Sequence, residues 1–269
     1  MSCIAENTFK NLNNAQMLVI SSAPIRTLYP NVFDGLSNLN NISLYNTGLN
    51  SIPSNSFNGL YSLKLCSIFQ SQITSLNKDS FAGLTNVVGL SLAANPIKTI
   101  YPQAFNGLNN LIDLGIVEAQ LNSLETNIFV TLTKLEKLDL NNNQINVIKE
   151  NAFNGLVRLN SLRLTGNTIE SINKMTFNGM ENLQLLYLNS NRLSSIQSDT
   201  FIYLKFLTLL DLGYNNIVTI DSDVFKSLYN LNNAYFGKNP IASTNESYLV
   251  GLCNSTLNPS CKISTCCST

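Results

Sequence analysis

The segment Leu138–Leu156 reads LDLNNNQINVIKENAFNGL, and its pattern organises the rest of the chain. Apolar residues alternate with polar ones at its start, three asparagines follow, and Phe153 comes ten residues after the last asparagine. The phenylalanine recurs every 24 residues with no insertion or deletion, at positions 9, 33, 57, 81, 105, 129, 153, 177, 201 and 225. A fixed period of this length indicates a repeat architecture.

We number the repeat so that this phenylalanine occupies position 19. Apolar residues then fill positions 1, 4, 6, 11, 14 and 22, and the unit reads LxxLxLxxNxLxxIxxxxFxxLxx. Positions 4 and 6 alternate with polar positions 3, 5 and 7, which is the period of a strand. One unit cannot bury its own leucines, whereas stacked neighbours can.

This consensus resembles the extracellular "typical" class of leucine-rich repeat over nearly the whole chain. The resemblance implies an α/β repeat solenoid: a right-handed arc with a concave parallel β-sheet and a convex side of loops and short helical turns. We expect the phenylalanines to stack between repeats. We expect positive φ at the glycine of the Asn-Gly pairs that follow them. These pairs are Asn58-Gly59, Asn106-Gly107, Asn154-Gly155 and Asn178-Gly179.

The period also predicts the boundaries. Residues 1–14 form a partial first repeat or a minimal N-terminal cap, and residues 15–244 form the solenoid of nine full repeats plus a terminal half repeat. Residues 245–269 form a cysteine-bearing C-terminal cap. Because the chain starts inside a repeat, two explanations stay open: a minimal cap, or a piece of a longer product. No signal peptide is visible.

The prediction of a C-terminal cap rests partly on the resemblance to this family. Caps in the family often begin with Asn-Pro and carry four cysteines, and Asn239-Pro240 precedes four here. Their spacing departs from the usual pattern, so all three pairings stay open, as does a reduced and disordered tail. The disulfide candidates are Cys253, Cys261, Cys266 and Cys267. Cys66 differs, since it falls at core position 4 and reads as a small buried hydrophobe.

Asp139, Asn141 and Asn143 are spaced like the start of an EF-hand calcium loop, which requires glycine at its sixth position. Gln144 stands there instead, so we expect no metal site, and we expect no cofactor. Asn143 occupies position 9, where the chain turns off the strand. Its amide can satisfy backbone groups that burial would leave unpaired. Early repeats carry other residues at position 9 and should be less rigid; they are Ala23, Thr47, Ser71 and Ala119.

Composition excludes several functions. The chain has no histidine, which rules out Ser-His-Asp and Cys-His nucleophiles and histidine zinc sites. Net charge is zero with 12% charged residues, so neither a nucleic-acid footprint nor a membrane patch is expected. No apolar run reaches the ~20 residues of a membrane span. We expect no enzyme, because the carboxylates Asp113, Glu136 and Asp139 lack a cleft-forming insertion.

Partner contacts are expected at solvent positions of the strands. From Asp139 onward, position 5 alternates charged and aromatic residues, and arginine and tyrosine are enriched in interface hot spots. Position 3 adds Leu185 and Leu209 among others. An alternative is that Asp139–Arg163 and Arg163–Asp211 are merely solvated charge pairs. The candidate partner-binding residues are Asp139, Arg163, Tyr187, Asp211, Tyr235, Lys137, Tyr214, Tyr45 and Phe69.

These observations predict a non-catalytic recognition module that binds a protein or glycoprotein on its concave sheet. The resemblance implies a secreted or cell-surface receptor or adhesion protein, monomeric or weakly dimeric. A structural matrix or scaffold protein that self-assembles is the alternative. Three N-x-S/T sequences make Asn41, Asn245 and Asn254 glycosylation candidates.

Overall fold

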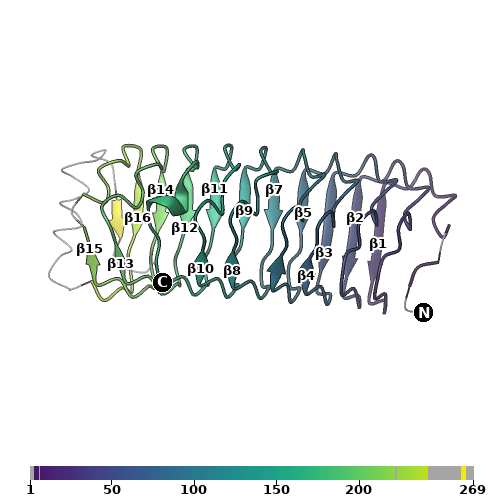
Figure 1. Cartoon of the computed structure of the whole chain (residues 1–269), viewed down its shortest axis with the longest axis horizontal. Coiled ribbons are helices and arrows are strands. Elements are labelled where there is room, and N and C mark those ends of the chain that lie inside the picture. Colours follow the sequence, from purple (N-terminus) through teal and green to yellow (C-terminus); the bar gives the residue numbers. More distant parts are fainter. Residues whose placement is uncertain (1–2, 6, 222, 242–261, 265–269) are drawn as a thin grey trace. The chain divides into compact units, whose positions relative to one another are not determined.

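Each repeat contributes one short strand to a parallel sheet in the computed structural model of the protein (Figure 1). The structure describes residues 3–5, 7–221, 223–241 and 262–264. Contacts divide the chain into two units. The first unit is Met1–Leu121 with Ile128–Leu135, and the second is Asn122–Asn127 with Glu136–Thr269. We describe each by itself.

In the first unit, each sheet strand pairs with the strand one repeat later, so the register shift is always 24 residues. Met17 pairs with Asn41, Ile42 with Cys66, and Leu90 with Leu114. The strands in order are β1 (Met17–Ser21), β2 (Asn41–Tyr45), β3 (Leu65–Phe69), β5 (Gly89–Ser91) and β7 (Asp113–Gly115). A second, two-stranded sheet joins β4 (Ser75–Leu76) to β6 (Thr99–Ile100).

The second unit follows the same plan from β9 to β16, while β17 pairs with β16 at a shift of 29 residues, Asn233 with Lys262. Its sheet strands are β9 (Lys137–Asp139), β11 (Ser161–Arg163), β12 (Leu185–Tyr187), β14 (Leu209–Asp211), β16 (Asn233–Tyr235) and β17 (Lys262–Ser264). Two-residue strands again form small separate sheets. They are β8 (Ser123–Leu124) with β10 (Val147–Ile148), and β13 (Ser195–Ile196) with β15 (Thr219–Ile220).

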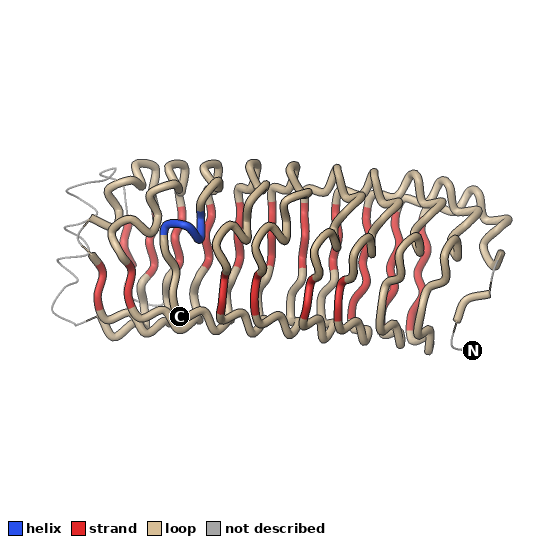
Figure 2. Tube along the Cα trace, viewed as in Figure 1, coloured by secondary structure: helices blue, strands red, loops and turns tan. Residues whose placement is uncertain are grey.

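The expected parallel repeat sheet is confirmed, and so is a convex side of loops and short turns, which hold i→i+3 backbone bonds such as Lys10 N to Asn7 O. Few of these turns extend into a helix: within the described residues the one helix is the 3₁₀ helix η1 (Lys174–Phe177), blue in Figure 2. From Asn7 to Asn151 position 17 has left-handed φ, which interrupts a helix. In η1 that position is Met175, which lacks positive φ. The paired two-residue strands were not predicted.

The phenylalanines stack between repeats as predicted. Ring centroids of successive residues from Phe9 to Phe129 lie 5.7 to 6.3 Å apart in the first unit. In the second unit Phe177 and Phe201 are 5.9 Å apart, and Phe225 meets Phe236 edge-on at 5.8 Å. From Phe33 to Phe225 every ring of the series is at most 1% exposed. This aromatic spine replaces helices as the packing element behind the sheet.

The asparagines of position 9 form the predicted ladder, as Asn191 shows. Its Nδ2 donates to the carbonyls of Leu164, one repeat earlier, and Leu188, at 2.9 and 3.0 Å. Its Oδ1 accepts from the backbone N–H of Ile169 at 3.0 Å. The same three bonds recur at Asn167, Asn215 and Asn239.

Earlier repeats use a different ladder. The hydroxyls of Thr47 and Ser71 lie 2.7 Å apart, both buried at position 9. Asn95 donates to Ile68 O and Leu92 O, but its Oδ1 has no hydrogen-bond partner. The position therefore stays polar and buried with fewer bonds, and the lower rigidity of these repeats stays a prediction.

Three positions of the repeat, numbers 8, 17 and 21, take left-handed backbone. Position 21 carries the predicted glycine, and these glycines have φ between 81° and 96° from Gly35 to Gly179. Position 8 was not predicted, yet it has φ between 50° and 69° from Ser22 to Lys238 and includes Asn142. Asparagine tolerates this region better than most residues other than glycine. Asn142 is therefore a turn residue.

Position 8 offers a stability test, because Ala94 has φ 53° there. Ala94→Asn is expected to raise the free energy of unfolding by about 0.5–1 kcal/mol, since asparagine relieves part of the left-handed strain. The bond from Ala94 N to Val117 O is unaffected. Ala93→Asn, next to it at ordinary φ, is the control and is expected to gain nothing. Urea unfolding measures both, and equal effects would contradict the strain explanation.

The structure tests one of the cysteine predictions, and the others fall on residues that it does not describe. Cys66 is 1% exposed, and burial raises the pKa of its thiol to about 12, which confirms the small buried hydrophobe. The disulfide candidates Cys253, Cys261, Cys266 and Cys267 lie outside the described residues, as do the glycosylation candidates Asn245 and Asn254. The proposed domain boundaries stay predictions.

Candidate partner-binding surface

Position 5 places five candidate residues on the same face of neighbouring strands in the second unit. Strand register aligns Asp139 with Arg163, Arg163 with Tyr187, Tyr187 with Asp211, and Asp211 with Tyr235. We call these five residues the position-5 row. Each lies between two buried residues of its strand or turn, so its side chain points away from the core.

Arg163 and Tyr187 form the centre of the row. The guanidinium carbon lies 5.3 Å from the centroid of the tyrosine ring, which is a cation–π contact. Among the described residues, the ion pairs are Lys149–Glu125 and Lys174–Asp199, and neither involves Arg163. Arg163 therefore makes no direct ion pair with Asp139 or Asp211, and the alternative of solvated charge pairs stays a prediction. Its charge is held on an aromatic face and left available to solvent.

The two aspartates of the row have a local role that sequence reasoning missed. Asp139 Oδ1 accepts from Asn141 N, and Asp211 Oδ1 accepts from Gly213 N, both at 3.0 Å. Burial raises the pKa of Asp211 above its ordinary value, and the bond from Gly213 opposes this in part. An aspartate two residues before a turn commonly makes this bond, and that spacing is the signal that could have revealed it.

Apolar side chains extend the surface beyond the candidates. Leu185 and Leu209 are register partners at position 3, both half-buried. At position 7, Gly213 and Gly237 present no side chain. Tyr214 follows at position 8, 53% exposed and with φ 53°. Leucine at position 3 of two successive strands was the available signal for this patch.

The charged candidate Lys137 lies on β9 beside the row. It is exposed, two residues before Asp139 on the same strand face, and its register partner is Ser161 of β11. No ion pair of the described residues includes it. Lys137 and Arg163 therefore stand on adjacent strands as two cations without carboxylate partners.

The aromatic candidates of the first unit form a separate pair. Tyr45 and Phe69 end β2 and β3, are register partners, and stack with centroids 5.2 Å apart and planes 8° from parallel. Both are half-buried. Asn41, which opens β2, is also half-buried, and its glycosylation stays a prediction.

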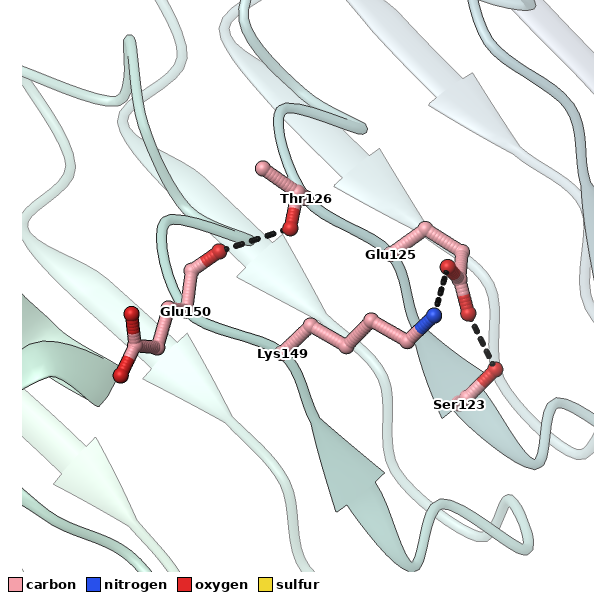
Figure 3. A network of polar contacts seen from close by, with 5 residues as sticks. All are labelled: Ser123, Glu125, Thr126, Lys149 and Glu150. Carbon is pink, nitrogen blue, oxygen red and sulfur yellow. Dashed lines mark hydrogen bonds and ion pairs between the residues drawn. The ribbon is translucent and has the colours of Figure 1, made fainter.

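A polar network between β8 and β10 is structural (Figure 3). Glu125 accepts from Lys149 through one carboxylate oxygen and from Ser123 through the other, and Thr126 donates to Glu150 O. The Lys149 ammonium lowers the pKa of Glu125 below its ordinary value. Both charged side chains are about half exposed, so the pair links neighbouring repeats weakly.

The side-chain amide of Asn143, a residue that could have been a calcium ligand, is hydrogen-bonded to backbone carbonyls. Its Nδ2 donates to Leu140 O at 3.0 Å and to Asn141 O at 3.3 Å. A search of the described part of the chain found no cluster of three or more His, Cys, Asp or Glu side chains that could hold a metal.

A parallel sheet with one strand per 24-residue repeat, a buried asparagine ladder and a polar outer face define a repeat-solenoid protein. The chain belongs to the leucine-rich repeat family. The profile described as "BspA type Leucine rich repeat region (6 copies)" matches residues 1–88 and 51–168, and the profile "Leucine rich repeat" matches residues 158–217. No curated protein sequence matches the chain.

Solved structures share the fold at low sequence identity. A chain of the TLR13–ssRNA13 complex aligns with TM-score 0.76 and 24% identity over 93% of this chain. A chain of the Drosophila Toll–Spatzle complex aligns with TM-score 0.70 and 23% identity over 98%. A chain of the octameric complex of Latrophilin 3, Unc5D and FLRT2 aligns with TM-score 0.65 and 20% identity over 91%.

The chain spans 40% and 39% of the first two matched chains and 82% of the third. Leucine-rich repeat domains are typically protein-binding modules and generally non-catalytic, and no catalytic family matches this chain. In the part of the chain that the structure describes, no helix has the length and apolar character needed to cross a membrane.

Proposed function

We propose that the protein is a non-catalytic recognition module that binds a protein or glycoprotein partner through the position-5 row. The contact of Arg163 with Tyr187 carries this proposal. Arginine and tyrosine dominate interface hot spots, and a guanidinium already stacked on a ring loses little conformational freedom on binding. The strands beneath are fixed by the ladder and the aromatic spine, so the surface is rigid before a partner arrives.

The setting we propose is a secreted or cell-surface receptor or adhesion protein with a cysteine-bearing C-terminal cap, monomeric or weakly dimeric. The fold of the Toll–Spatzle and FLRT2-containing complexes supports this setting. The TLR13 structure contains single-stranded RNA, so nucleic acid needs its own test. We propose no nucleic-acid partner for this chain, because phosphate binding depends on many Lys and Arg contacts and its net charge is zero.

The double variant Arg163→Ala/Tyr187→Ala is expected to weaken partner binding at least 100-fold, because two hot-spot side chains are removed together. Binding is measured against an array of secreted proteins and confirmed by surface plasmon resonance. Both residues are solvent-facing, so circular dichroism and the unfolding midpoint should stay close to those of the parent chain.

The matched control is Arg192→Ala/Tyr229→Ala, which removes the same residue types from exposed places outside the row. Binding should survive it. Equal loss in both doubles, or no loss in either, would contradict the row as the binding site. Concentration-dependent assembly with no partner would favour the scaffold alternative, and salt-sensitive binding of a single-stranded RNA oligonucleotide would contradict the exclusion of nucleic acid.

A further inference from the structure

We infer that the position-5 row, with Lys137 and Leu209 beside it, takes an extended partner segment in which a carboxylate side chain lies about three to four residues from an apolar side chain. This inference rests on the proposed function and specifies the chemistry of the partner. It follows from three features of the second unit: its unpaired cations, its apolar end, and the distance between them.

The cationic end consists of Lys137 on β9 and Arg163 on β11. Both side chains are exposed, both lie on the outer face of adjacent strands, and neither has a carboxylate partner among the described residues. Tyr187 holds the guanidinium, whose planar fork of N–H donors matches a carboxylate through two parallel hydrogen bonds. An acidic side chain is therefore the group that this end can bind best.

The aspartates of the row do not offer an equal site for a cation. Asp139 Oδ1 and Asp211 Oδ1 are each bonded to a backbone N–H two residues later. Asp139 is also flanked by Lys137 on its own strand and Arg163 on the next. On the outer face of β9 and β11 themselves, the two cations Lys137 and Arg163 thus stand against the single carboxylate of Asp139.

The apolar end lies on β12, β14 and β16. Leu185 and Leu209 face each other across β12 and β14, and Tyr187 and Tyr235 stand on either side of Asp211. All four are half-buried, so part of each remains for a partner to cover.

Strand spacing converts this arrangement into a sequence pattern. Arg163 lies one strand from the ring of Tyr187, two from Leu209 and three from Tyr235. At about 4.8 Å per strand, Leu209 and Tyr235 lie roughly 10 and 14 Å from Arg163 across the sheet. An extended segment advances about 3.3 Å per residue, so its acidic and apolar side chains would be about three to four residues apart.

The test selects binders from an unbiased library of random 12-residue peptides displayed on phage, with the whole chain as bait. Binders should be enriched in Asp or Glu about three to four residues from Leu, Ile, Phe or Tyr, and the Arg163→Ala/Tyr187→Ala chain should not retain them. For the tightest synthetic peptide, replacing its acid by the amide should weaken binding at least 10-fold by fluorescence anisotropy. Arg163→Gln should do the same.

Arg192→Gln is the matched control and should leave affinity unchanged, while Asp139→Asn should preserve or tighten it. Binders that need the row but lack acidic residues would overturn the inference and leave the proposed function standing. So would basic binders lost on Asp139→Asn, or equal competition by millimolar inorganic phosphate. Binders indifferent to the double variant, or no binders at all, would overturn both.

Discussion

Phe201→Ala is expected to lower the free energy of unfolding by about 3–5 kcal/mol, the range for removing a fully buried phenylalanine. Phe201 is 0% exposed, and its ring packs against that of Phe177 with centroids 5.9 Å apart and planes tilted by 34°. The loss combines removed apolar contact with a cavity between two stacked repeats, which the surrounding leucines cannot close without moving both. The phenylalanines of this series are the largest side chains that the core buries completely, so their truncation opens the largest cavity.

Phe206→Ala is a matched control within the same repeat. Phe206 is 54% exposed at position 24, so its truncation should change the free energy of unfolding by about 0.5 kcal/mol or less. Urea denaturation followed by circular dichroism measures the pair. Because repeat proteins can lose cooperativity, hydrogen exchange should show whether the repeats around Phe201 open first. Similar losses for the two variants would contradict the aromatic spine as a source of stability.

Asn191→Ala is expected to lower the free energy of unfolding by about 3–4 kcal/mol. The substitution leaves the N–H of Ile169 and the carbonyls of Leu164 and Leu188 without their amide partner in a buried turn. A buried backbone group without a partner costs about 1–3 kcal/mol, and water entering the space recovers part of this. Thermal unfolding and urea titration both measure the change.

Two further variants isolate the ladder. Asn182→Ala removes one exposed side-chain bond, to Val157 O, and is expected to cost less than about 1 kcal/mol. Asn191→Thr imitates Thr47, which occupies position 9 in an early repeat, and should fall between the parent and Asn191→Ala. If Asn191→Ala were as mild as Asn182→Ala, the ladder would not be an important source of stability.

The period allowed the fold to be read from the sequence because each rule acts once per repeat and is seen many times. Strand positions, the stacked rings and the amide ladder all follow from apolar and asparagine residues that recur at fixed places. The two-residue strands were not predicted because two residues give no periodicity of their own. The left-handed backbone at positions 8 and 17 was not predicted because residues as different as Asn142, Tyr214 and Asp79 fill those positions.

The candidate surface was predictable in position but not in conformation. The register of parallel strands places Asp139, Arg163 and Tyr187 in one row whatever their rotamers. The neighbour that Arg163 contacts depends on whether the Asp139 carboxylate or the Tyr187 ring interacts with it more favourably, and the sequence does not reveal this. Asp139 bonds the backbone of Asn141, and this leaves the guanidinium to the ring of Tyr187.

The 24-residue register of the repeats also bears on how such a gene can change. Every rung of the amide ladder joins residues separated by a constant number, so duplicating or deleting one whole repeat restores each rung with a new neighbour. An insertion of any other length inside the strand or its turn would break several rungs at once. We therefore expect lineages of this protein to differ by whole repeats and by substitutions on the outer face, with inserted loops rare.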